Sequence, residues 1–155
     1  MFKTSKISYG GTAAVVTCMA LISGLGAADA TKAVIVSSLL IAAFADNLTD
    51  ALSFHIFQES EQLDQKDAFT RTITNFVARL LLCISFVLLI GLLPLVYASK
   101  VAMVWGMLLL AMMTYLVARE RKVKPILEVV KHLLVASVVV LASNVIGHWT
   151  GSVFR

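Results

Sequence analysis

Long apolar runs, separated by short polar or charged segments, dominate the sequence. A helix needs about 20 apolar residues to cross a hydrocarbon core about 30 Å thick. The polar segments leave runs of at least that length, which cover about residues 9–28, 33–57, 71–97, 99–118 and 125–154. The pattern therefore predicts an all-α integral membrane protein with five transmembrane helices in a single domain, residues 1–155.

Composition supports the same class of protein. Of the 155 residues, 59% are hydrophobic and 14% are charged, whereas a soluble domain has about 25% charged residues. A large soluble enzyme, a disulfide-stapled secreted domain and a disordered tail are therefore excluded. The formal net charge is +4, but the Lys and Arg residues are scattered along the chain rather than clustered. We therefore expect a lipid bilayer as partner and no nucleic acid.

The basic residues predict how the chain is oriented. Eight of them fall on one side of the five predicted helices: Lys3, Lys6, Lys66, Arg71, Arg119, Arg121, Lys122 and Lys124. The other side has only Lys32, Lys100 and Arg155. Cytoplasmic loops are enriched in Lys and Arg, so we expect a cytoplasmic N-terminus and a C-terminus on the opposite side. The expected location is multi-pass in a bacterial inner membrane.

The N-terminal segment also has features of a secretory signal peptide. Lys3 and Lys6 precede an apolar stretch, and small residues follow at 26–30 (GAADA), as at a signal-peptidase site. The apolar stretch is longer than most signal-peptide cores, however, and the next apolar run follows after a very short connector. A transmembrane helix is therefore favoured over a cleaved signal.

Polar residues inside the second and third predicted helices are the strongest functional signal. Asp46, Asp50 and Ser53 share one helix face, because residues three and four apart are neighbours on a helix. Thr72, Asn75 and Arg79 form a similar stripe on the third helix. The two stripes occupy mirror-image positions about the polar connection at residues 58–67. This register predicts that both stripes point into the bundle, with an Asp46–Arg79 ion pair near the bilayer midplane.

Two interpretations of these residues remain open. In the first, the ion pair is static and determines how the two helices pack. In the second, the stripe is a metal or proton site formed by Asp46, Asp50 and Ser53, with Asn75 and Arg79 as charge and hydrogen-bond partners. Asp46 would stay ionised beside Arg79, and Asp50, without a cationic partner, would exchange protons. Ionisable residues within a membrane are costly and often functional.

Other polar residues are weaker candidates. His55, Glu59 and Glu61 lie at the cytoplasmic end of the second predicted helix, where they could collect cations or form an ordinary solvated helix end. Lys131 and His132, with Glu128 one turn earlier, are typical of an interfacial set that reaches the lipid headgroups.

Small residues predict close helix packing. Gly147 and Gly151 form a G-x-x-x-G step, and Ala20 with Gly24 forms a similar one. By contrast, the sequence has no Walker loop, no H-E-x-x-H, no C-x-x-C and no G-x-S-x-G motif. We therefore expect neither an enzyme nor a permanently bound cofactor.

Four segments together resemble the vacuolar iron transporter family. Residues 45–61 (ADNLTDALSFHIFQESE) look like the family's second-helix segment, and residues 24–26 (GLG) resemble the end of its first helix. Residues 91–94 (GLLP) are similar to its third helix, and residues 133–154 to its last. The resemblance implies a homodimer of five-helix subunits, with metal held near the dimer axis. It also implies export of Fe²⁺ or Mn²⁺ by proton antiport.

The sequence departs from the family at the positions that the resemblance would make metal ligands. Ala13 stands where the family has an aspartate, Asp50 where it has a methionine, and Phe54 where it has a glutamate. The family's long acidic insertion after the second helix is replaced by the short connection at residues 58–67. The acidic pair Asp46 and Asp50 remains in about the position of a transport site.

The sequence thus predicts a membrane transporter for a divalent metal, iron or manganese, or for a proton-coupled cation. The alternative is a non-transporting membrane protein that keeps the fold as a structural or interaction module.

Overall fold

The computed structural model describes residues 5–60 and 65–154 and confirms the all-helical class, with five helices long and apolar enough to cross a membrane. The first span belongs to α1 (Ser5–Ala27). The second combines α2 (Lys32–Ile41), the π-helical turn η1 (Ala42–Asp46) and α3 (Asn47–Ser60) without a break. The remaining spans are α4 (Gln65–Leu92), α5 (Leu95–Glu120) and α6 (Pro125–Val153). The chain is therefore a multi-pass helical membrane protein.

The third predicted helix began at residue 71, but α4 begins at Gln65, and the two predicted limits next to Pro94 were also wrong. The third predicted helix ran to residue 97 and the fourth began at residue 99, but α4 ends at Leu92 and α5 begins at Leu95. Pro94 is the reason, because proline has no N–H to continue α4. Its carbonyl instead accepts hydrogen bonds from the backbone N–H groups of Tyr97 and Ala98, at 3.0 and 2.9 Å. Pro94 therefore lies just past the end of α4 and serves as the N-cap of α5.

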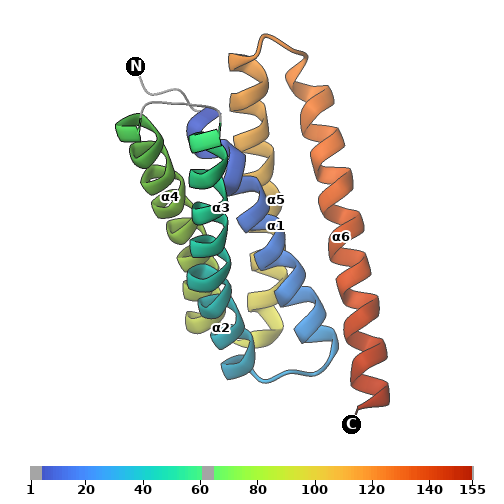
Figure 1. Cartoon of the computed structure of the whole chain (residues 1–155). Coiled ribbons are helices and arrows are strands. Elements are labelled where there is room, and N and C mark those ends of the chain that lie inside the picture. The colour runs from blue at the N-terminus through green and yellow to red at the C-terminus, as the bar shows by residue number, and fades with distance from the viewer. Residues whose placement is uncertain (1–4, 61–64, 155) are drawn as a thin grey trace.

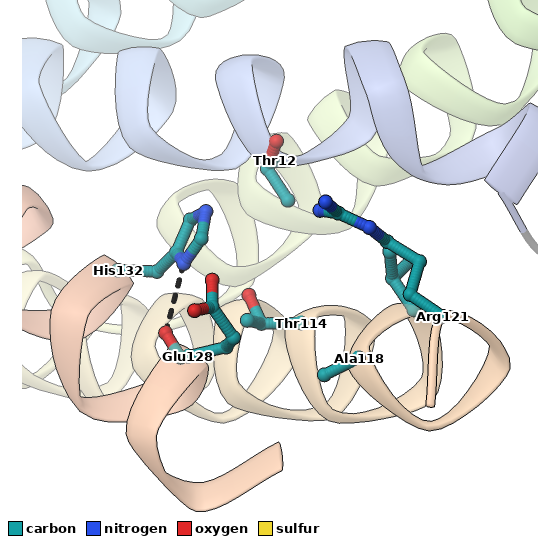
Figure 2. Close-up of a pocket in the computed structure, with 7 residues that line it drawn as sticks. Thr12, Thr114, Ala118, Arg121, Glu128 and His132 are labelled. Carbon is teal, nitrogen blue, oxygen red and sulfur yellow. Dashed lines mark hydrogen bonds between the residues drawn. The ribbon is translucent and has the colours of Figure 1, made fainter. Parts of the chain in front are cut away.

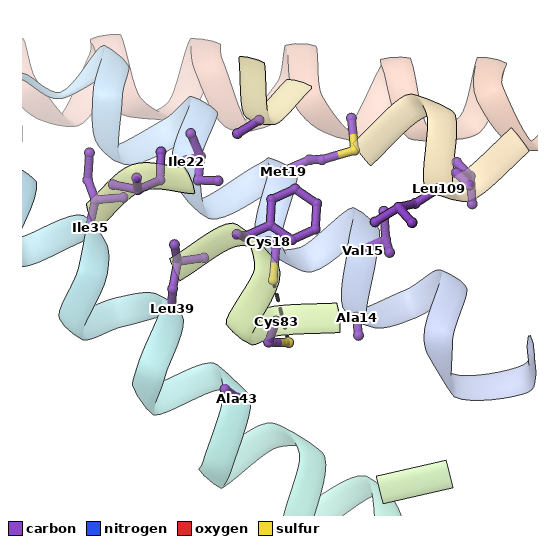
Figure 3. Close-up of a cluster of buried hydrophobic side chains, with 14 of the residues drawn as sticks. Ala14, Val15, Cys18, Met19, Ile22, Ile35, Leu39, Ala43, Cys83 and Leu109 are labelled. Atoms are coloured by element: carbon purple, nitrogen blue, oxygen red, sulfur yellow. Dashed lines mark hydrogen bonds between the residues drawn. The ribbon is translucent and has the colours of Figure 1, made fainter. Parts of the chain in front are cut away.

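Helix α1 is the centre of the bundle, in contact with α4, α5 and α6 (Figure 1). Its side chains Val15, Cys18, Met19 and Ile22 are fully buried. Figure 3 shows them packed against residues of α2, α4 and α5, with the Cys18 and Cys83 sulfur atoms 3.5 Å apart. Both cysteines are free thiols inside an apolar core.

Small residues bring α1 and α6 into backbone contact. A Cβ added to Gly147 would overlap the carbonyl of Gly24, and one added to Gly151 would lie 3.2 Å from the Cα of Ala28. Helix α6 buries only Ala136 and Gly147 among its described residues. The rest of its surface is partly or fully exposed and largely apolar, as expected of a helix that faces lipid.

The described basic residues of the predicted cytoplasmic side lie at one end of the bundle. The start of α1, the end of α3, the start of α4 and the turn between α5 and α6 are all at that end, and α6 finishes at the other (Figure 1). Lys3 lies outside the described residues, as does the side chain of Lys6. The two groups of loops are thus separated as predicted, while the orientation in the membrane stays a prediction.

Candidate cation site on the second span

A π-helical turn interrupts the second span at Ala42–Asp46. Such a turn closes i to i+5 hydrogen bonds and accommodates one extra residue, and π turns inside α-helices are frequent at functional sites. The inward residues Ile35, Leu39, Ala43, Asn47 and Ala51 follow one another at intervals of four and are all buried. In a straight α-helix, residues four apart point in directions that differ by about 40° around the helix axis. The π turn offsets part of that difference and keeps the five residues on the face toward the bundle.

Arg79 of α4 is buried, with 6% of the residue exposed, and meets two side chains of α3. Its Nε donates a hydrogen bond to Asn47 Oδ1 at 2.8 Å. Its terminal NH2 group forms an ion pair with the Asp50 carboxylate. Asn47 in turn donates through Nδ2 to the Ala43 carbonyl of the π turn at 2.8 Å. The guanidinium thus joins α4 to α3 and, through Asn47, to the irregular turn.

The predicted Asp46–Arg79 ion pair is wrong. The expected depth of Arg79 along the second span was nearly right, because Arg79 forms a hydrogen bond with Asn47, the residue directly after Asp46. The helix face expected to meet Arg79 was wrong, since successive residues of an α-helix point about 100° apart. The prediction that Asp50 lacks a cationic partner is also wrong, because Arg79 extends toward it.

The acidic stripe faces outward instead of into the bundle. Asp46, Asp50 and Ser53 are all exposed, with 50% of the Asp50 side chain accessible. Thr72, at one end of the polar stripe predicted on the third helix, is buried on α4. The structure thus keeps the stripe on one face of the second span but turns that face away from the core of the bundle.

Asn75 of α4 is also buried, with 3% of the residue exposed, and lies one helical turn before Arg79. Gly10 of α1 packs on both, because a Cβ added there would lie 2.6 Å from Asn75 Oδ1 and 2.7 Å from Arg79 Cδ. Within the described part of the chain, Asn75 Oδ1 has no hydrogen-bond partner. Three helices, α1, α3 and α4, therefore enclose a polar layer beside the two aspartates.

The candidate residues nearer the end of α3 are only partly described. The His55 ring is half-buried and makes an edge-to-face contact with the Phe69 ring of α4, at a centroid separation of 6.4 Å. Glu61 lies outside the described residues, and so does the side chain of Glu59. The structure therefore brings His55 to α4 and does not test the predicted cation-collecting group.

The chemistry available to the described part of the chain is limited. The described residues include no group of three or more His, Cys, Asp or Glu side chains that could hold a metal ion. Asp46 and Asp50 supply two carboxylates on one exposed face, and one of these is paired with Arg79. A complete oxygen-ligand set for a divalent cation needs more donors than these two side chains.

Asn47 was missed in the sequence. An amide between two aspartates draws less notice than the acids, yet it is the buried side chain that receives Arg79. The signal was present in the intervals of four from Ile35 to Ala51, which fit a π turn better than a regular helix. Comparison with models of protein families, with curated proteins and with solved structures finds no match for this chain.

Proposed function

We propose that the chain is a cation transporter that works as a homodimer, with a transport site formed by Asp46 and Asp50 of both copies. The observation that supports it best is the exposure of both carboxylates on a membrane-spanning helix. Asp46 is close to the middle of the span Lys32–Phe57. A charged side chain at that depth costs from about 2.5 kcal/mol upward in contact with lipid. The face therefore needs water, a cation or a protein partner.

A second copy of the chain would supply such a protein partner. In a two-fold symmetric dimer, a surface patch of one subunit contacts the same patch of the other. The stripes of two α3 helices would then bring four carboxylates together, two from each subunit. The proposed site would be incomplete without the partner copy, in agreement with the small number of metal ligands among the described residues of one copy.

Carboxylate oxygens suit hard divalent cations such as Mn²⁺ better than soft ions such as Cu⁺, and iron is proposed beside manganese only on the resemblance to vacuolar iron transporters. Arg79 supplies a counter-charge for Asp50 when no cation is bound. An arriving cation would compete with this guanidinium, and protons returning to the carboxylates would displace the cation. The resemblance to vacuolar iron transporters supports the same class of ion and the same proton antiport.

The test is a flux measurement on the purified chain in liposomes. Fe²⁺ and Mn²⁺ uptake would be followed under an imposed pH gradient for the wild type and for Asp46→Asn and Asp50→Asn. We expect gradient-dependent flux that each substitution reduces at least tenfold, because each removes an anionic ligand. Asp29→Asn is the matched control, since Asp29 lies in the turn between α1 and α2. Wild-type flux in Asp46→Asn would contradict the proposal.

The second candidate is a non-transporting membrane protein that keeps the fold as an interaction module. The Arg79–Asp50 pair favours it, because this pair neutralises one of the two acids without any bound ion. Absence of flux for both metals, in protein that is folded and dimeric in the same liposomes, would select this second function.

A further inference from the structure

A second polar site lies away from the aspartates, at the end of the bundle where α5 turns into α6. A cavity of about 280 Å³ is present there between α1, α5 and α6 (Figure 2). Its polar lining comprises Thr12, Thr114, Arg121, Glu128 and His132. The volume is near the lower end of the range for small-molecule sites. The transport proposal uses none of these residues.

Thr114 is the observation that indicates a ligand. The residue is 5% exposed, and its hydroxyl oxygen is buried with no hydrogen-bond partner in the described part of the structure. Figure 2 shows this hydroxyl directed into the cavity. Buried polar groups are almost always hydrogen-bonded, so the cavity offers an unsatisfied position for a polar ligand atom.

The two sides of the cavity differ in hydrogen-bonding character. On the α5 side, Arg121 brings a cation that can only donate. On the α6 side, His132 Nδ1 lies 2.8 Å from the Glu128 carbonyl oxygen. A carbonyl only accepts, so Nδ1 carries the hydrogen and Nε2 of the neutral ring is an acceptor. The Glu128 carboxylate is a further acceptor and has Lys131 at 3.1 Å from one oxygen.

We propose that this cavity binds the phosphoethanolamine headgroup of a membrane phospholipid. The phosphate would lie against Arg121 and the Thr114 hydroxyl, and the ammonium would donate to Glu128 and His132. Guanidinium and hydroxyl groups donate hydrogen bonds to phosphate oxygens. A carboxylate and an unprotonated imidazole nitrogen accept hydrogen bonds from a primary ammonium.

The surroundings favour a lipid over a soluble phosphate compound. The cavity lies at a helix end, which is the depth of lipid headgroups in a spanning bundle. Val135, which lies three residues beyond His132 on nearly the same face of α6, is apolar and exposed. Acyl chains attached to a headgroup in the cavity could lie along this surface, whereas a free phosphate compound would gain nothing from it.

The experiment measures lipid binding to the purified full-length protein in detergent by native mass spectrometry. The probes are dioleoyl phosphatidylethanolamine, dioleoyl phosphatidylcholine and free O-phosphoethanolamine. We expect the ethanolamine lipid to bind most tightly, because the choline headgroup has no N–H to donate to Glu128 and His132. Thr114→Val should weaken its binding about 10-fold, the lower end of the range for a hydrogen bond to a charged group such as the phosphate. Arg121→Gln should weaken it about 10- to 150-fold, the range for hydrogen bonds to a charged group.

Arg119→Gln is the matched control, because Arg119 is exposed near the same turn and does not line the cavity. It should leave the affinity unchanged. Arg121 is itself exposed, so its substitution tests the proposal even if Thr114→Val perturbs folding. Equal affinity for the two lipids, or an equal loss in Arg119→Gln and Arg121→Gln, would overturn the headgroup assignment. Binding of free O-phosphoethanolamine as tightly as the lipid would overturn the assignment to a lipid.

Discussion

At the scale of single residues, Arg79 organises the polar layer inside the bundle. A buried guanidinium is stable only with a counter-charge and hydrogen-bond acceptors, and Arg79 has Asp50 and Asn47. In the sequence, Arg79 already stood out as a charged residue inside a predicted span, which predicts an acidic partner on the neighbouring helix. The choice between Asp46 and Asp50 depended on the rotation of α3, which the identities of the acids do not reveal.

The Arg79–Asp50 pair makes a prediction about stability. Arg79→Met should lower the unfolding temperature in detergent, because it leaves Asp50 without its counter-charge. Removing one partner of a buried ion pair lowers the free energy of unfolding by about 3–5 kcal/mol. The Asp50 carboxylate is half-exposed, so we expect a loss at or below the lower end of this range. The double variant Arg79→Met/Asp50→Asn should be more stable than Arg79→Met alone. Unfolding followed by tryptophan fluorescence measures both, and additive losses would show that the two side chains are not coupled.

At the scale of elements, two local irregularities control how the helices meet. The π turn decides which face of α3 is turned toward α4, and the glycines of α1 and α6 decide how closely those helices approach. Gly147 was predicted as a packing residue from its G-x-x-x-G spacing, and the structure gives it Gly24 as a neighbour. The helix that packs against Gly147 could not be derived from the spacing. A G-x-x-x-G step shows that another helix can approach closely, but it does not show which helix does so.

The close contact between α1 and α6 predicts different outcomes for two glycine substitutions. Gly147→Ala should destabilise the protein by about 1–3 kcal/mol, the usual cost of overpacking, because the new methyl group meets the backbone of Gly24. Gly91→Ala is the control, since a Cβ there has no atom within 4 Å. That change should be neutral or stabilise the helix by about 0.5–1 kcal/mol. Equal unfolding temperatures for the two variants would show that α6 is not packed this closely.

At the scale of the whole molecule, the unusual property is an exposed acidic face on a bundle otherwise bordered by apolar side chains. Ser53, Asp50 and Asp46 all lie on that face of the second span. The opposite border, formed by α6, is apolar and compatible with lipid contact. This asymmetry is the physical basis for expecting the second copy on the α3 face and lipid on the α6 face.

Cross-linking tests this arrangement. In a background in which Cys18 and Cys83 are replaced by alanine, Ser53→Cys should form a disulfide-linked dimer upon mild oxidation in membranes. Val138→Cys, on the exposed surface of α6, should stay monomeric on a denaturing gel. The reverse result would place the interface on α6 and contradict a shared site at Asp46 and Asp50.

The sequence alone determined the number of spans, most of their limits and the separation of the loops between the two ends of the bundle. These properties depend on local quantities, namely the length of apolar runs and the charges between them. Three further properties depend on how the helices pack: Arg79 meets Asp50 and Asn47, Asp46 faces outward, and Thr114, Arg121 and His132 line one cavity. Rotation of the second span about its axis explains the first two, since one additional residue in the π turn changes the face that every later residue of that span presents. The cavity depends on how α1, α5 and α6 come together.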